Sequence, residues 1–338
     1  MGKHHWPAIE VLYALGVLLV ILGHSHSSDW STFEHTPLVP LIRFIYLFHM
    51  AMFFCIAGFL FRNSDSLATK GYPRWLGNKA LRLLVPYFLW SLIALAPKYY
   101  FEHHSFQGLT PATILTSLFC PRQNIWGHFW FLPVLFLTYA LFGLLPKRQP
   151  AQQTPPALSG ALLAVCLALY FLPVHSGILG LFDLCKSLVF FELGIIVREH
   201  LTTRWTVFEE NVHRLAIPSA VVCFALGVWL GGFAPSNRAA SLAAAVLLIA
   251  FCSLIATMMP PFSLISWIAR NNFTLYLFSW MFQAVVMELC GRLHCPWHAT
   301  SLAMFVAGFA GPAVLVLIFE RLPWRDNRLL RLAVGFPS

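Results

Sequence analysis

The chain has 338 residues, of which 59% are hydrophobic and only 10% are charged, and its mean hydropathy is +0.72. Soluble globular domains carry about 25% charged residues, so this composition excludes that class and predicts an all-α integral membrane protein. The formal net charge of +9 is expected to reflect basic cytoplasmic loops, and no nucleic-acid partner is expected.

Ten apolar segments have the length of membrane-spanning helices, which need about 20 mostly apolar residues. In chain order they are residues 8–25, 38–61, 81–100, 128–146, 157–174, 178–198, 215–233, 239–259, 271–290 and 299–320. No stretch between them is long enough to build a soluble core of its own. We therefore interpret residues 1–338 as a single membrane domain, a bundle of about ten transmembrane helices.

Basic residues are concentrated in alternate loops. Five lie within residues 62–82, and others lie at 147–148, at 198–214 and in the tail after residue 320, whereas the intervening loops are nearly bare. Because cytoplasmic loops collect Lys and Arg, this pattern predicts that both termini are cytoplasmic.

The eight cysteines lie mostly inside apolar segments and lack the spacing of a metal site, so no bound metal is expected. Cys290, Cys295 and Cys120 fall near the predicted outer face. We expect them to pair if that face is oxidising.

Two histidines occupy positions that lipid disfavours. His24 ends the first apolar segment, and His49 lies about halfway along the second, which is antiparallel to the first. An ionisable group at mid-membrane costs about 2.5–3.5 kcal/mol on insertion scales and usually marks a site. The two imidazoles are expected in the outer half of the bundle, either as part of a polar pocket or as structural hydrogen-bond donors between helices.

Five pieces of sequence carry a family resemblance. They are "IEVLYALGVLLVILGHS" (9–25), "FHMAMFFCIAGFLF" (48–61), "KALRLLVPYFLW" (79–90), "HFWFLPVLFL" (128–137) and "NNFTLYLF" (271–278). In this order they resemble membrane acyltransferase family 3, in particular its fucose 4-O-acetylase-like branch. The resemblance implies ten helices and transfer of an acyl group, commonly acetyl from acetyl-CoA, to a sugar hydroxyl.

The resemblance also assigns residues. His24 occupies the position of the family's essential histidine, whereas the basic residue eleven positions earlier is replaced by Tyr13. The paired basic motif of the third helix is present as Lys79 and Arg82. The histidine often found after the "LYL" motif of the ninth helix is replaced by Ser279.

Acyl transfer from a thioester to an alcohol needs a base, and imidazole titrates near neutral pH. His24 is the predicted base, with His49 as a second catalytic candidate; direct transfer and a covalent acyl intermediate remain alternatives. Lys79 and Arg82, one helical turn apart, are predicted to bind the phosphates of acetyl-CoA, which acts as donor and not as a permanently bound cofactor. The alternative is that they are ordinary cytoplasmic anchors.

Access of the acceptor sugar from either membrane face stays open, and its candidate contacts lie near the predicted outer face. Arg43 is predicted to orient it or to stabilise the developing oxyanion, and His128 and Trp130 to contact its ring. Aromatic residues also gather at this depth in membranes without any catalytic role, which is the alternative for Trp130.

The sequence thus predicts an O-acyltransferase, most simply an O-acetyltransferase, of a bacterial inner membrane. Its partners would be the acyl-CoA donor, a polysaccharide or lipid-linked glycan acceptor, the lipid bilayer and other polysaccharide-synthesis proteins. Two alternatives stay open: a glycan transporter or flippase, and a non-catalytic assembly subunit, the latter raised by Tyr13 and Ser279.

Overall fold

The computed structural model describes residues 6–26, 36–61, 65–95, 110–124, 126–145, 155–323 and 327–336. All regular secondary structure in these ranges is helical: α1 (Pro7–Gly23), α3 (Leu38–Phe61), α4 (Asp65–Lys70), α5 (Tyr72–Ile93), α7 (Pro111–Phe119), the 3-10 turns η2 (Pro121–Gln123) and η3 (Gly127–Trp130), α8 (Phe131–Leu144), α9 (Pro156–Phe171), η4 (Ile178–Gly180), α10 (Leu181–Gly231), α11 (Arg238–Met258), α12 (Ser263–Arg292), α13 (Trp297–Arg321) and α14 (Arg328–Val334). Residues 27–35, 96–109 and 146–154, from predicted loops and the end of the predicted span 81–100, lie outside the described residues.

Several helices match the predicted spans in length and composition. Five are long and apolar enough to cross a membrane: α3, α11, α12, α13 and the segment Gly127–Leu144. Three shorter apolar helices, Pro7–Gly23, Ala157–Phe171 and Leu215–Gly231, coincide with further predicted spans. The remaining two, 81–100 and 178–198, overlap α5 and the start of α10. The all-helical fold is confirmed, whereas the ten crossings and the orientation stay predictions.

Two helices differ from expectation for local reasons. The α5 helix begins at Tyr72, well before residue 81, because Gly71 takes a φ of 74° and Pro73 occupies the first turn, where its missing N–H is not needed. The α10 helix continues through the predicted loop 199–214. That stretch contains neither Gly nor Pro, so nothing in its sequence breaks a helix.

The chain divides into two compact units. Unit 1 comprises Met1–Phe53 and Arg204–Asn327, and unit 2 comprises Phe54–Thr203 and Arg328–Phe336. The α3 and α10 helices contribute to both units. That residues 1–338 form a single membrane domain stays a prediction.

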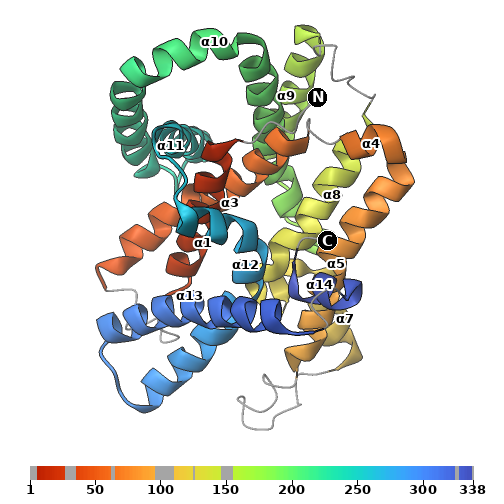
Figure 1. Ribbon diagram of the computed structural model, residues 1–338, viewed down its shortest axis with the longest axis vertical. Helices are drawn as coiled ribbons and strands as arrows, with labels where there is room; N and C mark the ends of the chain where they lie inside the picture. The colour runs from red at the N-terminus through yellow and green to blue at the C-terminus, as the bar shows by residue number, and fades with distance from the viewer. Residues whose placement is uncertain are drawn as a thin grey trace. The chain divides into compact units, whose positions relative to one another are not determined.

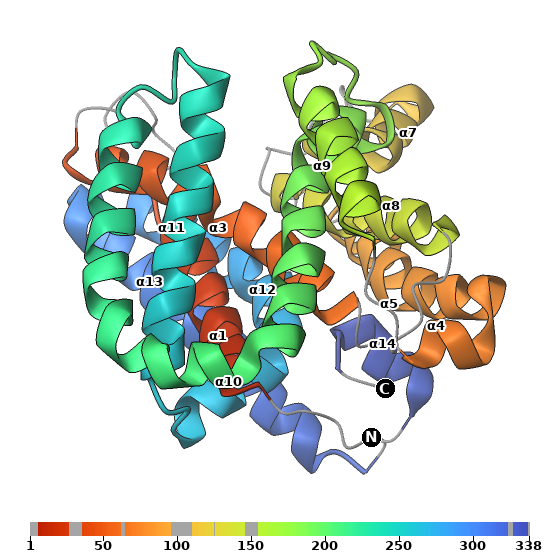
Figure 2. The ribbon, with the colours of Figure 1, turned by 90° about the horizontal axis from the view of Figure 1, so that it is seen from above.

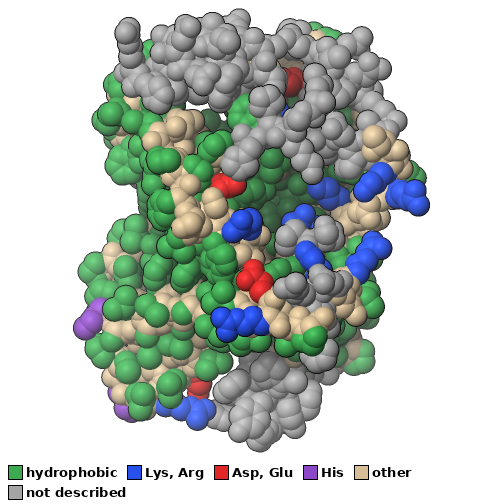
Figure 3. Space-filling view, viewed as in Figure 1, with side chains coloured by type: hydrophobic (Ala, Val, Ile, Leu, Met, Phe, Trp, Pro, Cys, Tyr) green, Lys and Arg blue, Asp and Glu red, His purple; other side chains and the backbone are tan. Residues whose placement is uncertain are grey.

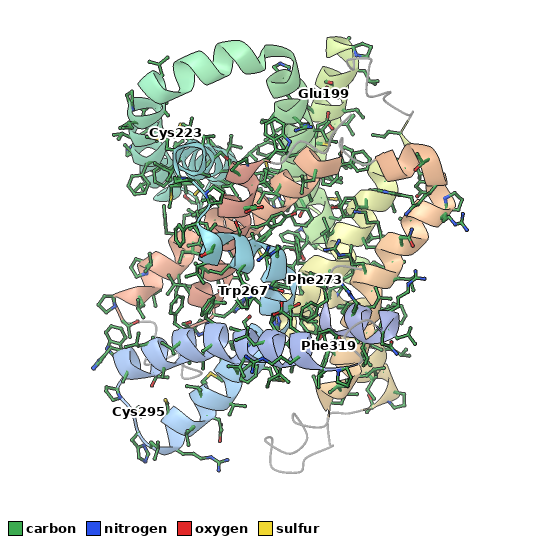
Figure 4. The ribbon with its side chains drawn as sticks, in the orientation of Figure 1. Glu199, Cys223, Trp267, Phe273, Cys295 and Phe319 are labelled. Atoms are coloured by element: carbon green, nitrogen blue, oxygen red, sulfur yellow. The ribbon has the colours of Figure 1, made fainter. Side chains whose placement is uncertain are left out.

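In unit 1, α1 packs against α11, α12 and α13, and α12 packs along α13 (Figure 1, Figure 2). Val17 and Ile21 of α1 are fully buried there. The turn between α12 and α13 carries Cys295, labelled in Figure 4. This packing surrounds the helix whose end carries His24.

In unit 2, α5 packs against α8 and α14 packs against α5 (Figure 2). An aromatic cluster forms the core: Phe61, Trp75, Tyr139 and Phe191 contact one another at centroid distances of 5.5–6.4 Å. Phe191 is fully buried. The predicted donor-binding residues of α5 lie beside this cluster.

Candidate active site

His24 directly follows α1 and forms its C-terminal cap, with φ −96° and ψ 0°. Its ring contacts aromatic side chains from two other helices of unit 1. The ring centroid lies 6.0 Å from that of Tyr46 in α3 and 5.5 Å from that of Trp280 in α12. The histidine is partly exposed. The imidazole predicted to act as base therefore lies between two helices and keeps some access.

His49 also contacts Tyr46, with its ring centroid 5.3 Å from that of the tyrosine. Its side chain is 5% exposed, and Nδ1 is 2.8 Å from the carbonyl oxygen of Ile45. A carbonyl oxygen can only accept, so Nδ1 carries the proton of this bond. In the neutral ring the lone pair is then on Nε2. Both predicted catalytic histidines thus contact one tyrosine.

A polar network joins the end of α1 to α12 and α3. Gln283 of α12, which is fully buried, donates from Nε2 to the carbonyl oxygen of Ile21 (2.8 Å) and to Ser25 Oγ (2.9 Å). Ser25 Oγ donates to the same carbonyl at 2.7 Å. The Tyr46 hydroxyl donates to the carbonyl oxygen of Gly23 at 2.8 Å. The residues on both sides of His24 are therefore bonded to neighbouring helices.

The sequence analysis missed Tyr46, Trp280 and Gln283. None of these three side chains is charged at neutral pH, so the cost of a charge in lipid does not mark them. A signal was available for Gln283, because an amide inside the apolar run "WMFQAVVM" needs a hydrogen-bond partner in lipid.

Tyr13 and Ser279, which replace residues of the family pattern, both pack within unit 1. Tyr13 is partly buried, with its ring centroid 6.2 Å from that of Phe53. Ser279 is buried and donates to the carbonyl oxygen of Tyr276 in its own helix. Arg43 lies exposed on α3, one turn before Tyr46.

In unit 2, Lys79 lies on aromatic rings. Its Nζ is 4.0 Å from the centroid of Tyr139 and 5.7 Å from that of Trp75. Lys79 precedes the apolar segment 81–100, and burial, with a smaller contribution from the charge of Arg82, lowers its pKa to about 8. Arg82 is exposed. Figure 3 shows Lys and Arg side chains over α4 and the start of α5.

His128 and Trp130 lie in η3 and are largely buried, at 7% and 9% exposed. The His128 ring stacks on Trp126 at a centroid distance of 6.0 Å. The guanidinium of Arg122 lies 4.0 Å from the Trp130 centroid and pairs through two nitrogens with Asp183, at 2.7 and 3.0 Å. One face of the Trp130 ring is therefore already covered by a cation.

The predicted site residues fall into two groups. His24, His49 and Arg43 belong to unit 1, and Lys79, Arg82, His128 and Trp130 belong to unit 2. The structure brings His24 and His49 together around Tyr46 and places Lys79 one turn from Arg82. All eight cysteines are free thiols, so pairing among Cys290, Cys295 and Cys120 stays a prediction.

Comparisons with known proteins agree with the family expected from the sequence motifs. Nodulation protein NolL of Sinorhizobium fredii is 28% identical over 145 residues, which are 40% of this chain and 37% of that protein. Nodulation protein NolL of Mesorhizobium japonicum is 26% identical over 137 residues, 39% of this chain and 34% of that protein. The match thus covers little more than a third of either relative. No solved structure is significantly similar. Residues 6–321 match the Acyl_transf_3 family, described as an acyltransferase domain, and because this match covers nearly the whole chain, the protein belongs to that family.

Proposed function

We propose that this protein is a membrane O-acetyltransferase that moves an acetyl group from acetyl-CoA to a sugar hydroxyl of a polysaccharide or lipid-linked glycan in a bacterial inner membrane. The observation that carries the proposal is the position of His24 in an acyltransferase-family chain. Its imidazole caps α1 between Tyr46 and Trp280 and is partly exposed. An ionisable group held in this way inside a helical bundle is expected to have a functional role.

In the proposed reaction His24 takes the proton of the acceptor hydroxyl as its oxygen attacks the thioester carbonyl. The new C–O bond forms, the C–S bond breaks, and the proton passes to the departing thiolate, giving an acetyl ester and free CoA. His49 is the second catalytic candidate because its neutral ring carries a lone pair on Nε2 beside Tyr46. It would relay or hold a proton for the same step.

Lys79 and Arg82 are proposed to bind the anionic phosphates of the donor. Two cations one turn apart on α5 offer the fixed positive charge that phosphates require. Lys79 also contacts the Tyr139 ring, which stabilises its ammonium form despite burial.

The acceptor is proposed to meet Arg43, His128 and Trp130. Arg43 is exposed on the same helix as Tyr46 and would orient the sugar or stabilise the oxyanion. Trp130 and His128 are mostly buried, so only a small part of either side chain is exposed for contact with an acceptor.

The first experiment compares cells that carry the wild-type protein, His24→Ala or no protein. O-acetyl groups on surface and secreted glycans are measured by proton NMR and mass spectrometry, and isolated membranes are supplied with isotope-labelled acetyl-CoA. His175→Ala is the matched control, because His175 is an exposed histidine outside the site. Equal amounts of inserted protein are verified for every variant.

We expect acetylation to disappear with His24→Ala and without the protein, and to persist with His175→Ala. Acetylation that depends on the protein but survives His24→Ala would contradict the catalytic role and favour an assembly subunit. Movement of unmodified glycan without any acyl donor would instead favour a transporter.

A further inference from the structure

The end of α1 poses a hydrogen-bonding problem. The last four carbonyl groups of a helix have no hydrogen-bond donor within the helix, and inside a membrane there is little water to donate to them instead. In α1 these are the carbonyls of residues 20–23. Two of them bond to the backbone that follows: Val20 accepts from the His24 N–H at 3.2 Å, and Leu22 accepts from the Ser25 N–H at 3.0 Å.

Side chains from other helices bond to the other two carbonyls. Ile21 accepts from Gln283 Nε2 of α12 and from Ser25 Oγ, at 2.8 and 2.7 Å. Gly23 accepts from the Tyr46 hydroxyl of α3 at 2.8 Å. Every carbonyl of the last turn of α1 therefore accepts a hydrogen bond. The bonds from α12 and α3 hold the backbone directly before and after His24.

The orientation of the Gln283 amide follows from its partners. Its Nε2 must face the Ile21 carbonyl, because the opposite orientation would place two acceptors against each other. Its Oε1 has no hydrogen-bond partner among the described residues, although the side chain is completely buried. Burying an oxygen without a hydrogen-bond partner costs free energy. The two hydrogen bonds that Gln283 Nε2 donates, to Ile21 and to Ser25, offset this cost.

The α13 helix leaves room for this side chain at Gly308. A Cβ added to Gly308 would lie 2.8 Å from Gln283 Cγ and Cδ and 2.9 Å from Ile21 Cγ2. These atoms are in the middle of the glutamine and close to the α1 backbone, so they have little freedom to give way. The absence of a side chain at residue 308 thus permits the contact between Gln283 and α1.

We infer that Gln283 and Tyr46 are positioning residues that hold the end of α1, and with it the imidazole of His24, in the orientation needed for acyl transfer. The inference rests on the proposed function of His24. Neither side chain exchanges a proton with the substrate; Gln283 and Tyr46 fix the backbone on either side of the base. Displacement of a catalytic group by about 1 Å can lower a rate about a hundredfold.

The test uses Gln283→Met, which keeps the length of the side chain but removes both donations, and Tyr46→Phe, which keeps the ring beside His24 but removes the bond to Gly23. Ser253→Ala is the matched control, because the Ser253 hydroxyl donates within its own helix, to the carbonyl oxygen of Ile249 at 2.8 Å. Each purified full-length protein is examined for monodispersity and thermal stability in detergent before further measurement.

Two readouts separate positioning from folding. The first is the rate at which diethyl pyrocarbonate modifies His24 in the folded protein, measured by peptide mass spectrometry. We expect a several-fold change with Gln283→Met and a smaller one with Tyr46→Phe, and none with Ser253→Ala. The second is turnover: kcat is expected to fall about tenfold to a hundredfold with Gln283→Met, while KM for acetyl-CoA stays unchanged.

The outcomes are distinguishable. Unaltered His24 reactivity and kcat in a folded Gln283→Met protein would overturn the inference, as would lower thermal stability with normal kcat. A wild-type protein without acetyl transfer would overturn the proposed function, whereas the His24 reactivity would still report on the structural part of the inference. If Gln283→Met does not fold, Tyr46→Phe decides, because Tyr46 is 43% exposed and its ring is retained.

Discussion

Helices α3 and α10 approach so closely within unit 2 that glycine is required on both. A Cβ added to Gly58 of α3 would lie 1.9 Å from the carbonyl oxygen of Phe191, and one added to Gly194 of α10 would lie 2.0 Å from that of Cys55. Ordinary contacts of a Cβ begin at 3.4 Å. The obstacles are backbone atoms, which cannot rotate away. Gly58→Ala therefore requires the two helices to separate by about 1.5 Å.

Separation of the helices disturbs the packing around Phe191, which is fully buried and contacts Phe61 and Tyr139. Overpacking a well-packed core costs about 1–3 kcal/mol. Because the clash involves backbone on both sides, we expect Gly58→Ala to cost about 3 kcal/mol, which lowers the folding equilibrium constant about a hundredfold.

The matched control is Gly160→Ala in α9, where an added Cβ meets nothing within 4 Å. At such an open helical position alanine is favoured over glycine by about 0.5–1 kcal/mol. Thermal unfolding of both purified variants in detergent, followed by tryptophan fluorescence and by size-exclusion recovery, measures the difference. Equal midpoints for Gly58→Ala and Gly160→Ala would refute the close approach of α3 and α10.

Three further predictions concern charges and thiols. Because Lys79 loses its charge as the pH rises through about 8, the affinity of the wild-type protein for acetyl-CoA should fall between about pH 7 and pH 10, whereas the affinity of Lys79→Arg should not. The same pH dependence of acetyl-CoA affinity in both proteins would argue against donor binding by Lys79. Arg122→Gln should destabilise the protein more when Asp183 is present than in an Asp183→Asn background, and a double-mutant cycle should give a coupling energy of about 1–3 kcal/mol. If the effects of the two substitutions on the free energy of unfolding simply add, the pair does not stabilise the protein. If the α12–α13 turn faces an oxidising compartment, thiol–disulfide exchange with a small disulfide should join Cys290 to Cys295 and release two small thiols, and non-reducing peptide mapping would find the cross-link. Reduced cysteines that react with thiol reagents only from the cytoplasmic side would reverse the predicted orientation.

Helix bounds could be predicted where an apolar run ends at a strong local signal. The expected segment 38–61 coincides with α3, and 239–259 differs from α11 by one residue at each end. Asn237 explains the start of α11, since its Oδ1 accepts from the N–H groups of Ala239 and Ala240. The α5 helix starts nine residues before the predicted segment 81–100, because Arg74, Asn78 and Lys79 interrupt the apolar residues of its first two turns.

The cost of an ionisable group in lipid singles out candidate site residues, but it does not reveal the side chains that they contact. His24 and His49 stand out because an imidazole in an apolar run is unusual. The bond from Gln283 to Ser25 joins residues 258 positions apart and involves no charge, so neither spacing nor charge pattern predicts it. The Arg122 guanidinium over Trp130 likewise depends on how separate elements of unit 2 pack.

The bond between Gln283 and Ser25 has a consequence for how the protein is made. Ribosomes add about 5–20 residues per second, so α12 is synthesised only tens of seconds after α1. During that interval the carbonyl group of Ile21 lacks its partner from α12, and a nascent chain that stalls before residue 283 never obtains it. Completion of the histidine's surroundings is thus coupled to completion of translation, and a truncated polypeptide is expected to reach the bilayer without becoming an active enzyme.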